Sequence, residues 1–168
     1  IVKGGSISNM IFYGPQGVGK TTVANIIAEE AGKRIYKLNA TNASLKDIQE
    51  ITKELDTFLG VNGVVLYLDE IQNFNKKQQQ SLLEYIEDGR ITLIASTTEN
   101  PYFYIFKALL SRSTIFEFKP VEEDDIKKAL NRAIDIKSKG YNEIKLDVKD
   151  EAINYLASYC NGDVRKAI

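Results

Sequence analysis

The sequence predicts an α/β fold, a three-layer αβα sandwich in which helices cover both faces of a five-stranded, mainly parallel sheet. Up to residue 118, short apolar runs alternate with segments whose apolar residues recur at helical spacing. One run, residues 64–68, is apolar without interruption, which is typical of a central parallel strand buried on both faces. After Pro120 the pattern is helical only. We therefore expect an α/β core at residues 1–119 and part of a small α-helical domain at residues 120–168.

The expected strands are short apolar runs between turn-forming residues. They cover residues 10–13, 34–38, 64–68, 91–95 and 115–118. Because helical segments separate them in sequence, neighbouring strands should run parallel.

The expected helices follow from apolar residues that share a face. Behind the first strand, Val23, Ile26 and Ile27 predict a helix over residues 22–31. A second helix begins after Ser44, its expected N-cap, and carries Leu45, Ile48, Ile51, Leu55, Phe58 and Leu59. A third runs to Gly89, which can end a helix in the left-handed conformation. Beyond Pro120 we expect helices around residues 126–134 and 152–157, and a last one that has Arg165 in its first turn.

Composition excludes several classes of protein. The 168 residues are 43% hydrophobic and 27% charged, enough for a hydrophobic core, and the net charge of −1 gives no global attraction to nucleic acid or membranes. The single cysteine, Cys160, excludes an intramolecular disulfide and should be a small buried hydrophobe. Histidine is absent, so there is no Cys/His metal set. No apolar stretch approaches the ~20 residues of a membrane span and no signal peptide is visible, so we expect a cytoplasmic protein.

A glycine-rich segment between the first strand and the first helix fits the phosphate-binding pattern G-x-x-x-x-G-K-[ST]. Backbone N–H groups of such a loop and a helix N-terminus converge on an anion. Lys20 would reach the β- and γ-phosphates, and the Thr21 hydroxyl would ligate Mg²⁺. The alternative is a glycine-rich turn that matches by chance, which the correct flanks disfavour. The expected nucleotide-binding residues of this segment are Gly14, Pro15, Gln16, Gly17, Val18, Gly19, Lys20, Thr21 and Thr22.

Two adjacent carboxylates, Asp69 and Glu70, end the uninterrupted apolar run. Ligands of open α/β sheets bind at the carboxyl ends of the strands, so both residues should lie at the same edge as the phosphate loop. Asp69 suits the oxygen-rich shell of Mg²⁺. Glu70 suits orienting or deprotonating an attacking water. A lone Asp-Glu pair would more simply cap a helix, but its combination with the phosphate loop favours the catalytic role.

Three later segments narrow the class of NTPase. Residues 95–101 place hydroxyls and an amide at the end of the fourth strand, although an Asn-Pro turn alone would explain them. Arg112 follows a helix end just before the fifth strand, and Arg165 follows a Gly-Asp pair. Either arginine alone would more simply be a solvated surface charge.

Together these segments resemble AAA+ ATPases, and in particular the replication-associated recombination protein A family. That family is also called maintenance of genome stability protein A, with the Werner-helicase-interacting proteins as eukaryotic relatives, and it is similar to clamp-loader ATPases. Residues 69–79, 87–89, 97–101 and 108–112 carry the resemblance, which covers nearly the whole chain. It implies ATP and Mg²⁺ as ligands and residues 120–168 as part of the family's helical lid.

The resemblance also implies roles for single residues. Thr98 matches the sensor 1 position. Arg112 matches the arginine finger, which acts on ATP bound by a neighbouring subunit, and Arg165 matches sensor 2 of the lid. Asn39, at the end of the second strand, would restrain Glu70 until DNA binds. Guanidinium groups at these positions would stabilise charge on the transferring phosphoryl oxygens.

The same resemblance implies the partners. They are DNA with single-strand/double-strand junctions or gapped forks, single-stranded DNA-binding protein, and further copies of the chain in a tetramer or ring near the nucleoid. The chain departs from the family at Gln16, where a proline is usual, and at Gln72 and Asn73, where His-Arg is usual. It also begins without methionine, so we expect a fragment that lacks the adenine-contacting segment, the rest of the lid and the family's oligomerisation region.

Two further features suggest DNA contacts but have simpler explanations. Lys76 and Lys77 open a helix that could face DNA, or could be a solvated helix end. The aromatic residues Tyr102, Phe103, Tyr104 and Phe106 could stack on bases, but we expect them to pack within their loop. The alternatives to a fork-remodelling ATPase are a clamp-loader subunit, a Holliday-junction branch-migration motor, and an adaptor that binds ATP without hydrolysing it.

Overall fold

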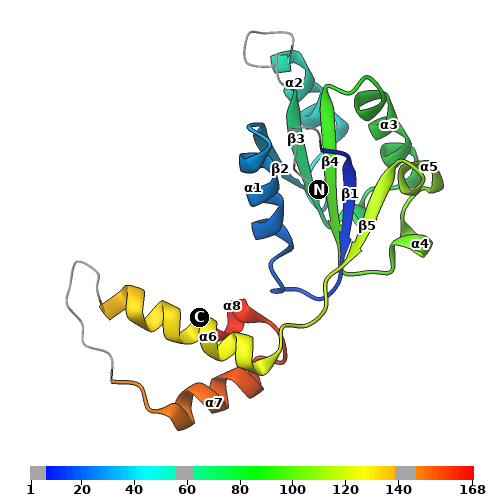
Figure 1. Ribbon diagram of the computed structural model, residues 1–168. Helices are drawn as coiled ribbons and strands as arrows, with labels where there is room; N and C mark the ends of the chain where they lie inside the picture. The colour runs from blue at the N-terminus through cyan, green and yellow to red at the C-terminus, as the bar shows by residue number, and fades with distance from the viewer. Residues whose placement is uncertain (1–6, 56–62, 139–146) are drawn as a thin grey trace. The chain divides into compact units, whose positions relative to one another are not determined.

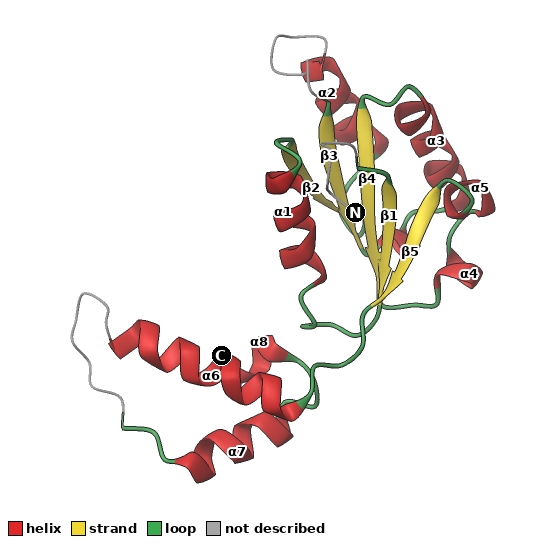
Figure 2. Cartoon of the chain, in the orientation of Figure 1, coloured by secondary structure: helices red, strands yellow, loops and turns green. Residues whose placement is uncertain are grey.

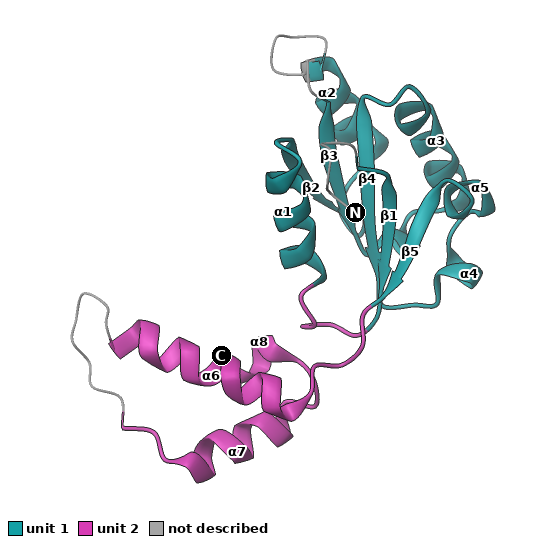
Figure 3. Ribbon diagram, viewed as in Figure 1, with its two compact units in different colours: residues 1–14, 20–117 teal, residues 15–19, 118–168 magenta. Residues whose placement is uncertain are grey.

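The computed structural model describes residues 7–55, 63–138 and 147–168 (Figure 1). The chain forms two compact units (Figure 3). The first contains residues 1–14 and 20–117, and the second contains residues 15–19 and 118–168. The domain boundary expected near residue 120 lies close to this division and stays a prediction. Phe58 and Leu59, expected on a helix, lie outside the described residues.

The first unit is built on a five-stranded sheet in the order β2-β3-β4-β1-β5 (Figure 2). Every pair of neighbouring strands is parallel, which confirms the predicted architecture. The strands are β1 Asn9–Tyr13, β2 Arg34–Asn39, β3 Val64–Asp69, β4 Ile91–Thr97 and β5 Ser113–Glu117. Because β3 and β4 lie inside the sheet and are covered on both faces, they are almost wholly buried.

Helices cover both faces of this sheet. Helix α1, Lys20–Glu30, lies on one face. Helices α2, Leu45–Leu55, and α3, Lys76–Glu87, pack on the other, together with the short helix α5, Lys107–Leu110. The core beneath α2, α3 and α5 includes Leu66, Leu68 and Leu93. A 3₁₀ turn, η2 Ile71–Asn73, and the one-turn helix α4, Pro101–Tyr104, complete the unit.

Helix α3 begins where its sequence predicts. The Asn75 side chain accepts a hydrogen bond from the Gln78 backbone N–H, and the Gln78 side chain accepts one from the Asn75 N–H. This reciprocal capping box satisfies donors that the first turn leaves without partners. At the other end Gly89 has φ 75°, in the left-handed region expected for it.

The buried face of α1 is not centred on its large aliphatic residues. In α1 the buried residues are Lys20, Ala24 and Ala28, whereas Ile26 is 52% exposed. Alanines allow the helix to approach the sheet closely, so the larger aliphatic residues of α1 are displaced from the centre of the contact.

The expected packing of the aromatic loop is wrong. Tyr102, Phe103 and Tyr104 are 65%, 82% and 53% exposed, and only Phe106 is partly buried, against the core. Helix α4 turns these three side chains outward, and only Pro101 within it is buried.

The second unit contains α6 Glu123–Ser138, α7 Asp150–Tyr159 and α8 Val164–Ala167. It has its own small apolar cluster, formed by Ile126, Leu130, Ile153, Ala157, Cys160 and Ala167. Cys160 is buried, as predicted. No helix within residues 7–55, 63–138 and 147–168 combines the length and apolarity needed to cross a membrane.

Candidate active site

Three predicted site segments lie at the same end of the sheet, where the carboxyl ends of its strands meet. Strand β1 leads into Gly14, β3 into Asp69 and Glu70, and β4 into Thr97 and Thr98. Because β1 and β4 are parallel neighbours, Tyr13 pairs with Thr97, and the Gly14 N–H donates to the Thr97 carbonyl at 3.2 Å. Parallel strands end at the same edge, which is where α/β sheets bind ligands.

The phosphate-loop sequence adopts a backbone that suits anion binding. Gly17 and Gly19 have φ values of 74° and 94°, which residues with a Cβ rarely adopt. Helix α1 begins directly afterwards, at Lys20. The Lys20 side chain is 9% exposed, and its Nζ donates to the Gly14 carbonyl at 2.7 Å. The lysine ammonium therefore lies against the start of the loop, where a phosphate oxygen can replace the carbonyl.

A chain of hydrogen bonds connects the two predicted magnesium ligands. The Thr21 and Tyr67 hydroxyl oxygens are 3.0 Å apart, and the Tyr67 hydroxyl donates to Ser96 Oγ at 2.9 Å. The Ser96 hydroxyl in turn donates to Asp69 Oδ1. An ionised carboxylate only accepts hydrogen bonds, so the donors run from Thr21 through Tyr67 and Ser96 to Asp69. This direction leaves the lone pairs of Thr21 Oγ1 available to a cation.

Tyr67 is suited to this position because it remains protonated. Burial raises the pKa of its phenol above the usual value of about 10, and the Asp69 charge acts in the same direction, while hydrogen bonds with Ser96 and Thr21 oppose it. A raised pKa means that the contribution of the phenol to stability is complete below about pH 10 and is lost at higher pH. The Tyr67 hydroxyl therefore stays a hydrogen-bond donor throughout the neutral pH range.

The donor set fits Mg²⁺ and a nucleoside triphosphate. Magnesium prefers hard oxygen ligands and is usually held by one or two protein oxygens together with phosphates and water. The Thr21 hydroxyl and the Asp69 carboxylate are of this kind, and Tyr67 Oη is within 3.5 Å of both Thr21 Oγ1 and Asp69 Oδ1. Their assignment as magnesium ligands stays a prediction.

Glu70 has an unusual backbone conformation. Its φ and ψ are 55° and 45°, in the left-handed region that non-glycine residues seldom occupy. Its N–H donates to Asp69 Oδ1 at 3.2 Å, and its carbonyl accepts from the N–H and side chain of Asn73. Strained conformations held from both sides cluster at functional sites.

The side chain that contacts the Glu70 carboxylate is Gln72. Gln72 Nε2 donates to Glu70 Oε2, while its Oε1 is buried without a hydrogen-bond partner. The expectation that Asn39 makes this contact is wrong. Asn39 Oδ1 instead accepts from the N–H and hydroxyl of Thr41, at 2.9 and 2.6 Å, and so shapes the turn after β2.

Thr98 directly follows β4 and is half-buried. The residues before it are more enclosed, since Ser96 and Thr97 are completely buried. Thr97 Oγ1 accepts from the Glu99 N–H at 3.0 Å and so turns the chain at the end of the strand. Thr98 remains the predicted sensor, and Ser96 is the residue of this segment that contacts Asp69.

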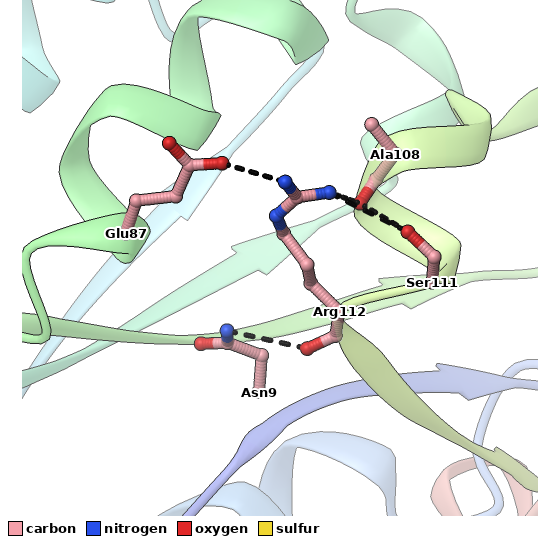
Figure 4. A network of polar contacts seen from close by, with 5 residues as sticks. All are labelled: Asn9, Glu87, Ala108, Ser111 and Arg112. Carbon is pink, nitrogen blue, oxygen red and sulfur yellow. Dashed lines mark hydrogen bonds and ion pairs between the residues drawn. The ribbon is translucent and has the colours of Figure 1, made fainter.

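Arg112 lies at the end of the sheet opposite Gly14. It precedes β5, and Asn9, the first residue of β1, pairs with Ser113. The guanidinium forms an ion pair with Glu87 at 2.9 Å and donates to the Ala108 carbonyl at 3.2 Å (Figure 4). The five residues of β1 separate Arg112 from Gly14, a distance of about 16 Å for an extended strand. The structure does not bring Arg112 together with Lys20, Asp69 and Glu70.

Arg165 belongs to the second unit, on α8. Its N–H donates to Asp163 Oδ1 at 3.0 Å, and its Nε lies 3.8 Å from the same oxygen. In this unit the Val164 N–H also donates to the Gly17 carbonyl at 3.2 Å. A Cβ at Gly17 would lie 1.7 Å from Asp163 Oδ1, so this approach requires glycine. The side chain of Arg165 is 68% exposed, and its role as sensor 2 stays a prediction.

The site roles of Tyr67, Ser96 and Gln72 were not predicted from the sequence. A signal for Tyr67 was present, because residues two apart on a strand point to the same face and Tyr67 precedes Asp69 by two. Ser96 could be identified only after β4 was known to lie beside β3. Gln72 follows a turn that the sequence did not predict.

Known proteins resemble this chain over all or most of its length. Residues 10–121 match the ATPase family associated with various cellular activities (AAA). The chain is 39% identical over 169 residues to replication-associated recombination protein A of Bacillus subtilis (strain 168), covering 100% of the chain and 39% of that protein. For the protein of the same name from Escherichia coli (strain K12), the identity is 37% over 168 residues, with 99% and 38% covered. The chain therefore spans about two fifths of the length of these relatives.

Among solved structures, the chain resembles Thermotoga maritima RuvB. One mutant form of RuvB superimposes with a TM-score of 0.79 at 28% identity, over 96% of this chain and 52% of that one. The sequence-based resemblance to the replication-associated recombination protein A family is confirmed by the names of the relatives. Since the family match covers most of the chain and includes the phosphate loop and both acidic residues, the chain belongs to the ATPase family associated with various cellular activities.

Proposed function

We propose that this chain is the ATP-hydrolysing module of a DNA replication, recombination and repair factor that acts at stalled or gapped forks. The observation that carries the ATPase part is the hydrogen-bond chain from Thr21 through Tyr67 and Ser96 to Asp69, at the sheet edge that also holds Glu70. It holds two oxygen ligands beside a phosphate-binding lysine. The DNA part rests on the relatives, whose names refer to replication and recombination.

Binding would use the loop and both oxygen ligands. Backbone N–H groups of residues 14–19 and the first turn of α1 would donate to phosphate oxygens, and Lys20 would exchange the Gly14 carbonyl for a phosphate oxygen. Thr21 and Asp69 would hold Mg²⁺, which neutralises phosphate charge when bound. Thr22, next along the helix, would contact the phosphates as well.

Hydrolysis would use Glu70 to orient a water molecule and accept its proton. The water oxygen would form a bond to the γ-phosphorus while the bond to the bridging oxygen of ADP breaks, which yields ADP and phosphate. Thr98 would hold the attacking water, and Arg165 of the same chain would stabilise charge on the γ-phosphate. Gln72 must release the Glu70 carboxylate before Glu70 can take this role.

The finger residue requires a second copy of the chain. Since Arg112 lies at the end of the sheet opposite Gly14, it would act on ATP bound by a neighbour in a tetramer or ring. The working protein would thus be a homo-oligomer. The protein would be cytoplasmic and nucleoid-associated. By its resemblance to the replication-associated recombination protein A family, it would also be a partner of single-stranded DNA-binding protein.

The test is steady-state ATP hydrolysis by the intact protein, with and without DNA that carries a single-strand/double-strand junction. We expect the junction to stimulate turnover. Glu70→Gln should still bind ATP but hydrolyse it at least ~100-fold more slowly. Turnover near wild type in Glu70→Gln would remove Glu70 from the water-orienting role, and ATP binding without turnover in the wild type would indicate a non-hydrolysing adaptor.

A branch-migration motor is the second candidate. The likeness to the Thermotoga maritima RuvB Holliday junction branch migration motor favours it, at a TM-score of 0.75 and 27% identity. The two candidates differ in their DNA products. ATP-dependent exchange of strands in a labelled four-way junction would favour the motor, whereas stimulation by gapped forks without strand exchange would favour the fork factor.

A further inference from the structure

A groove on the first unit lies outside the ATP site. It has a volume of about 470 Å³ and is formed where α3 meets the segment from α4 to α5. We call this site the aromatic–lysine groove. Its aromatic and basic lining residues are Lys76, Tyr102, Phe103, Tyr104, Phe106 and Lys107.

One buried glutamine fixes the shape of the groove. Gln79 is 2% exposed, and its Nε2 donates to the carbonyls of Phe74 and Tyr104, at 2.9 and 3.1 Å. Its Oε1 accepts from the Phe106 N–H at 2.8 Å. A single amide therefore joins α3 to Tyr104 and Phe106, on either side of the junction between α4 and α5. The loop is held in place although its side chains face solvent.

The exposure of three consecutive aromatic residues needs an explanation. Tyr102, Phe103 and Tyr104 are at least half exposed, and Phe103 is 82% exposed. Apolar surface that faces water costs free energy, and contiguous exposed patches usually mark binding sites. A loop that only had to pack could turn at least one of these rings inward, but the contacts of Gln79 hold it in the opposite arrangement.

The charge around the groove identifies the kind of ligand. Lys76 and Lys107 line the groove, and Lys77 beside them is exposed. Among the described residues that line the groove, none is acidic. Lys76 Nζ lies 5.7 Å from the centre of the Phe106 ring, so a positive charge and an aromatic face are presented together.

We propose that the aromatic–lysine groove binds single-stranded nucleic acid, with bases stacked on Tyr102 and Phe103 and phosphates next to Lys76 and Lys107. Aromatic rings beside cations are the usual means of binding unpaired strands, because every base has a face that can stack and every nucleotide carries a phosphate. Duplex DNA fits less well because its bases already stack on one another. This proposal rests on the DNA part of the proposed function and says which surface meets the unpaired strand.

The test is fluorescence anisotropy of a labelled oligothymidylate of about 20 nucleotides, titrated with the intact protein. Stacking on an aromatic side chain contributes about 1–3 kcal/mol per base, so Phe103→Ala should weaken binding by roughly 5- to 150-fold. Tyr102→Ala should act in the same direction, and Phe103→Trp should retain binding. Lys76→Gln should reduce the dependence of affinity on salt by about one phosphate contact.

The matched control is Tyr155→Ala. Tyr155 is 66% exposed, like Tyr102, but it stacks on Tyr159 in the second unit, away from the groove in sequence. The Tyr155→Ala variant should bind the oligonucleotide with the same affinity as the wild type. All of these side chains are exposed, so thermal midpoints and ATP turnover without DNA should be unchanged.

The outcomes separate this proposal from the proposed function. If the wild type binds the oligonucleotide and Phe103→Ala and Tyr102→Ala bind equally well, the groove is not the site, and the DNA role stands. If the wild type binds neither the oligonucleotide nor junction DNA, both proposals fail. If Phe103→Ala instead loses binding to a protein partner and keeps DNA binding, the surface is a protein interface and the proposal is wrong.

Discussion

At the scale of single residues, the site depends on side chains that hold its reactive groups. Thr21, Asp69 and Glu70 would meet Mg²⁺ or water, but Tyr67, Ser96 and Gln72 set their positions. Such supporting residues fix the orientation of ligands and the direction of hydrogen bonds. Their removal should therefore change the chemistry without removing any group that contacts the nucleotide.

Tyr67→Phe tests the hydrogen-bond chain. The change keeps the ring in the core but removes the hydroxyl that lies between Thr21 and Ser96. We expect the Mg²⁺ concentration needed for half-maximal ATP hydrolysis to rise, or the turnover to fall, by about 10- to 100-fold. The control is Tyr85→Phe, a partly buried tyrosine of α3. Equal behaviour of the two variants would mean that the chain of hydroxyls does not position the metal ligands.

Gln72→Ala tests the restraint on Glu70. Without its hydrogen bond to Gln72, the Glu70 carboxylate is free to turn toward water, so ATP turnover without DNA should rise by roughly 3- to 10-fold. Stimulation by DNA should shrink accordingly. Asn39→Ala, which alters only the turn after β2, should leave both quantities unchanged. A fall in turnover in Gln72→Ala would show that Gln72 aims Glu70 instead of restraining it.

The sequence suggested candidate nucleotide ligands more readily than the side chains behind them. Lys20, Thr21, Asp69 and Glu70 could be named as candidates because their expected chemistry depends on order along the chain. Ser96 contacts Asp69 across two neighbouring strands, so its role depends on sheet order, which no local pattern specifies. Roles that depend on sequence spacing can be predicted, whereas roles that depend on contacts across strands need the fold.

At the scale of elements, the strands were predicted almost to the residue and the helix faces were not. Strands β3 and β4 begin where their apolar runs begin, because such runs are typical of buried parallel strands, and β2 begins at Arg34 as predicted. The buried face of α1, centred on Ala24 and Ala28, was not predicted, since periodicity shows which residues share a face but not how closely a helix approaches its sheet. Helix α4 was missed, because a four-residue helix is too short to show a period.

Gln79→Ala tests the link between α3 and the aromatic loop. The substitution leaves the Phe74 and Tyr104 carbonyls and the Phe106 N–H without their side-chain partner. Buried polar groups left without hydrogen bonds are costly, so we expect the free energy of unfolding to fall by about 2–4 kcal/mol in urea titrations. Gln80→Ala, an exposed neighbour on the same helix, should change it by less than about 0.5 kcal/mol. Similar small effects in both would mean that Gln79 does not hold the loop.

At the scale of the whole molecule, we expect Arg112 to affect ATP turnover strongly and the free energy of unfolding only slightly. Its ion pair with Glu87 is about half exposed at both side chains, and such pairs contribute little. Arg112→Ala should therefore shift the free energy of unfolding by less than about 1 kcal/mol. As a finger that stabilises phosphoryl charge, however, it should reduce ATP turnover by about 10³-fold or more. Arg90→Ala, which removes a comparably exposed arginine paired with Asp88, should leave turnover unchanged.

Mixing experiments show whether the finger acts between chains. Arg112→Ala subunits retain an intact site, and Glu70→Gln subunits retain an intact finger, so mixed assemblies should regain part of the lost activity. The recovery should be greatest near equal amounts of the two variants. Mixtures that assemble, as shown by light scattering, but stay inactive at every ratio would exclude action in trans.

The placement of Arg112 before β5 and of Gly14 after β1 has a consequence for control of the enzyme. If Arg112 acts on a neighbour's ATP, as proposed, a solitary chain could bind ATP and still lack the group that completes its site. The rate per chain would then report how many neighbours are present, rising with protein concentration and falling on dilution at constant ATP. A cell could silence such an enzyme by keeping its copies apart, and could start it by gathering them on one stretch of DNA.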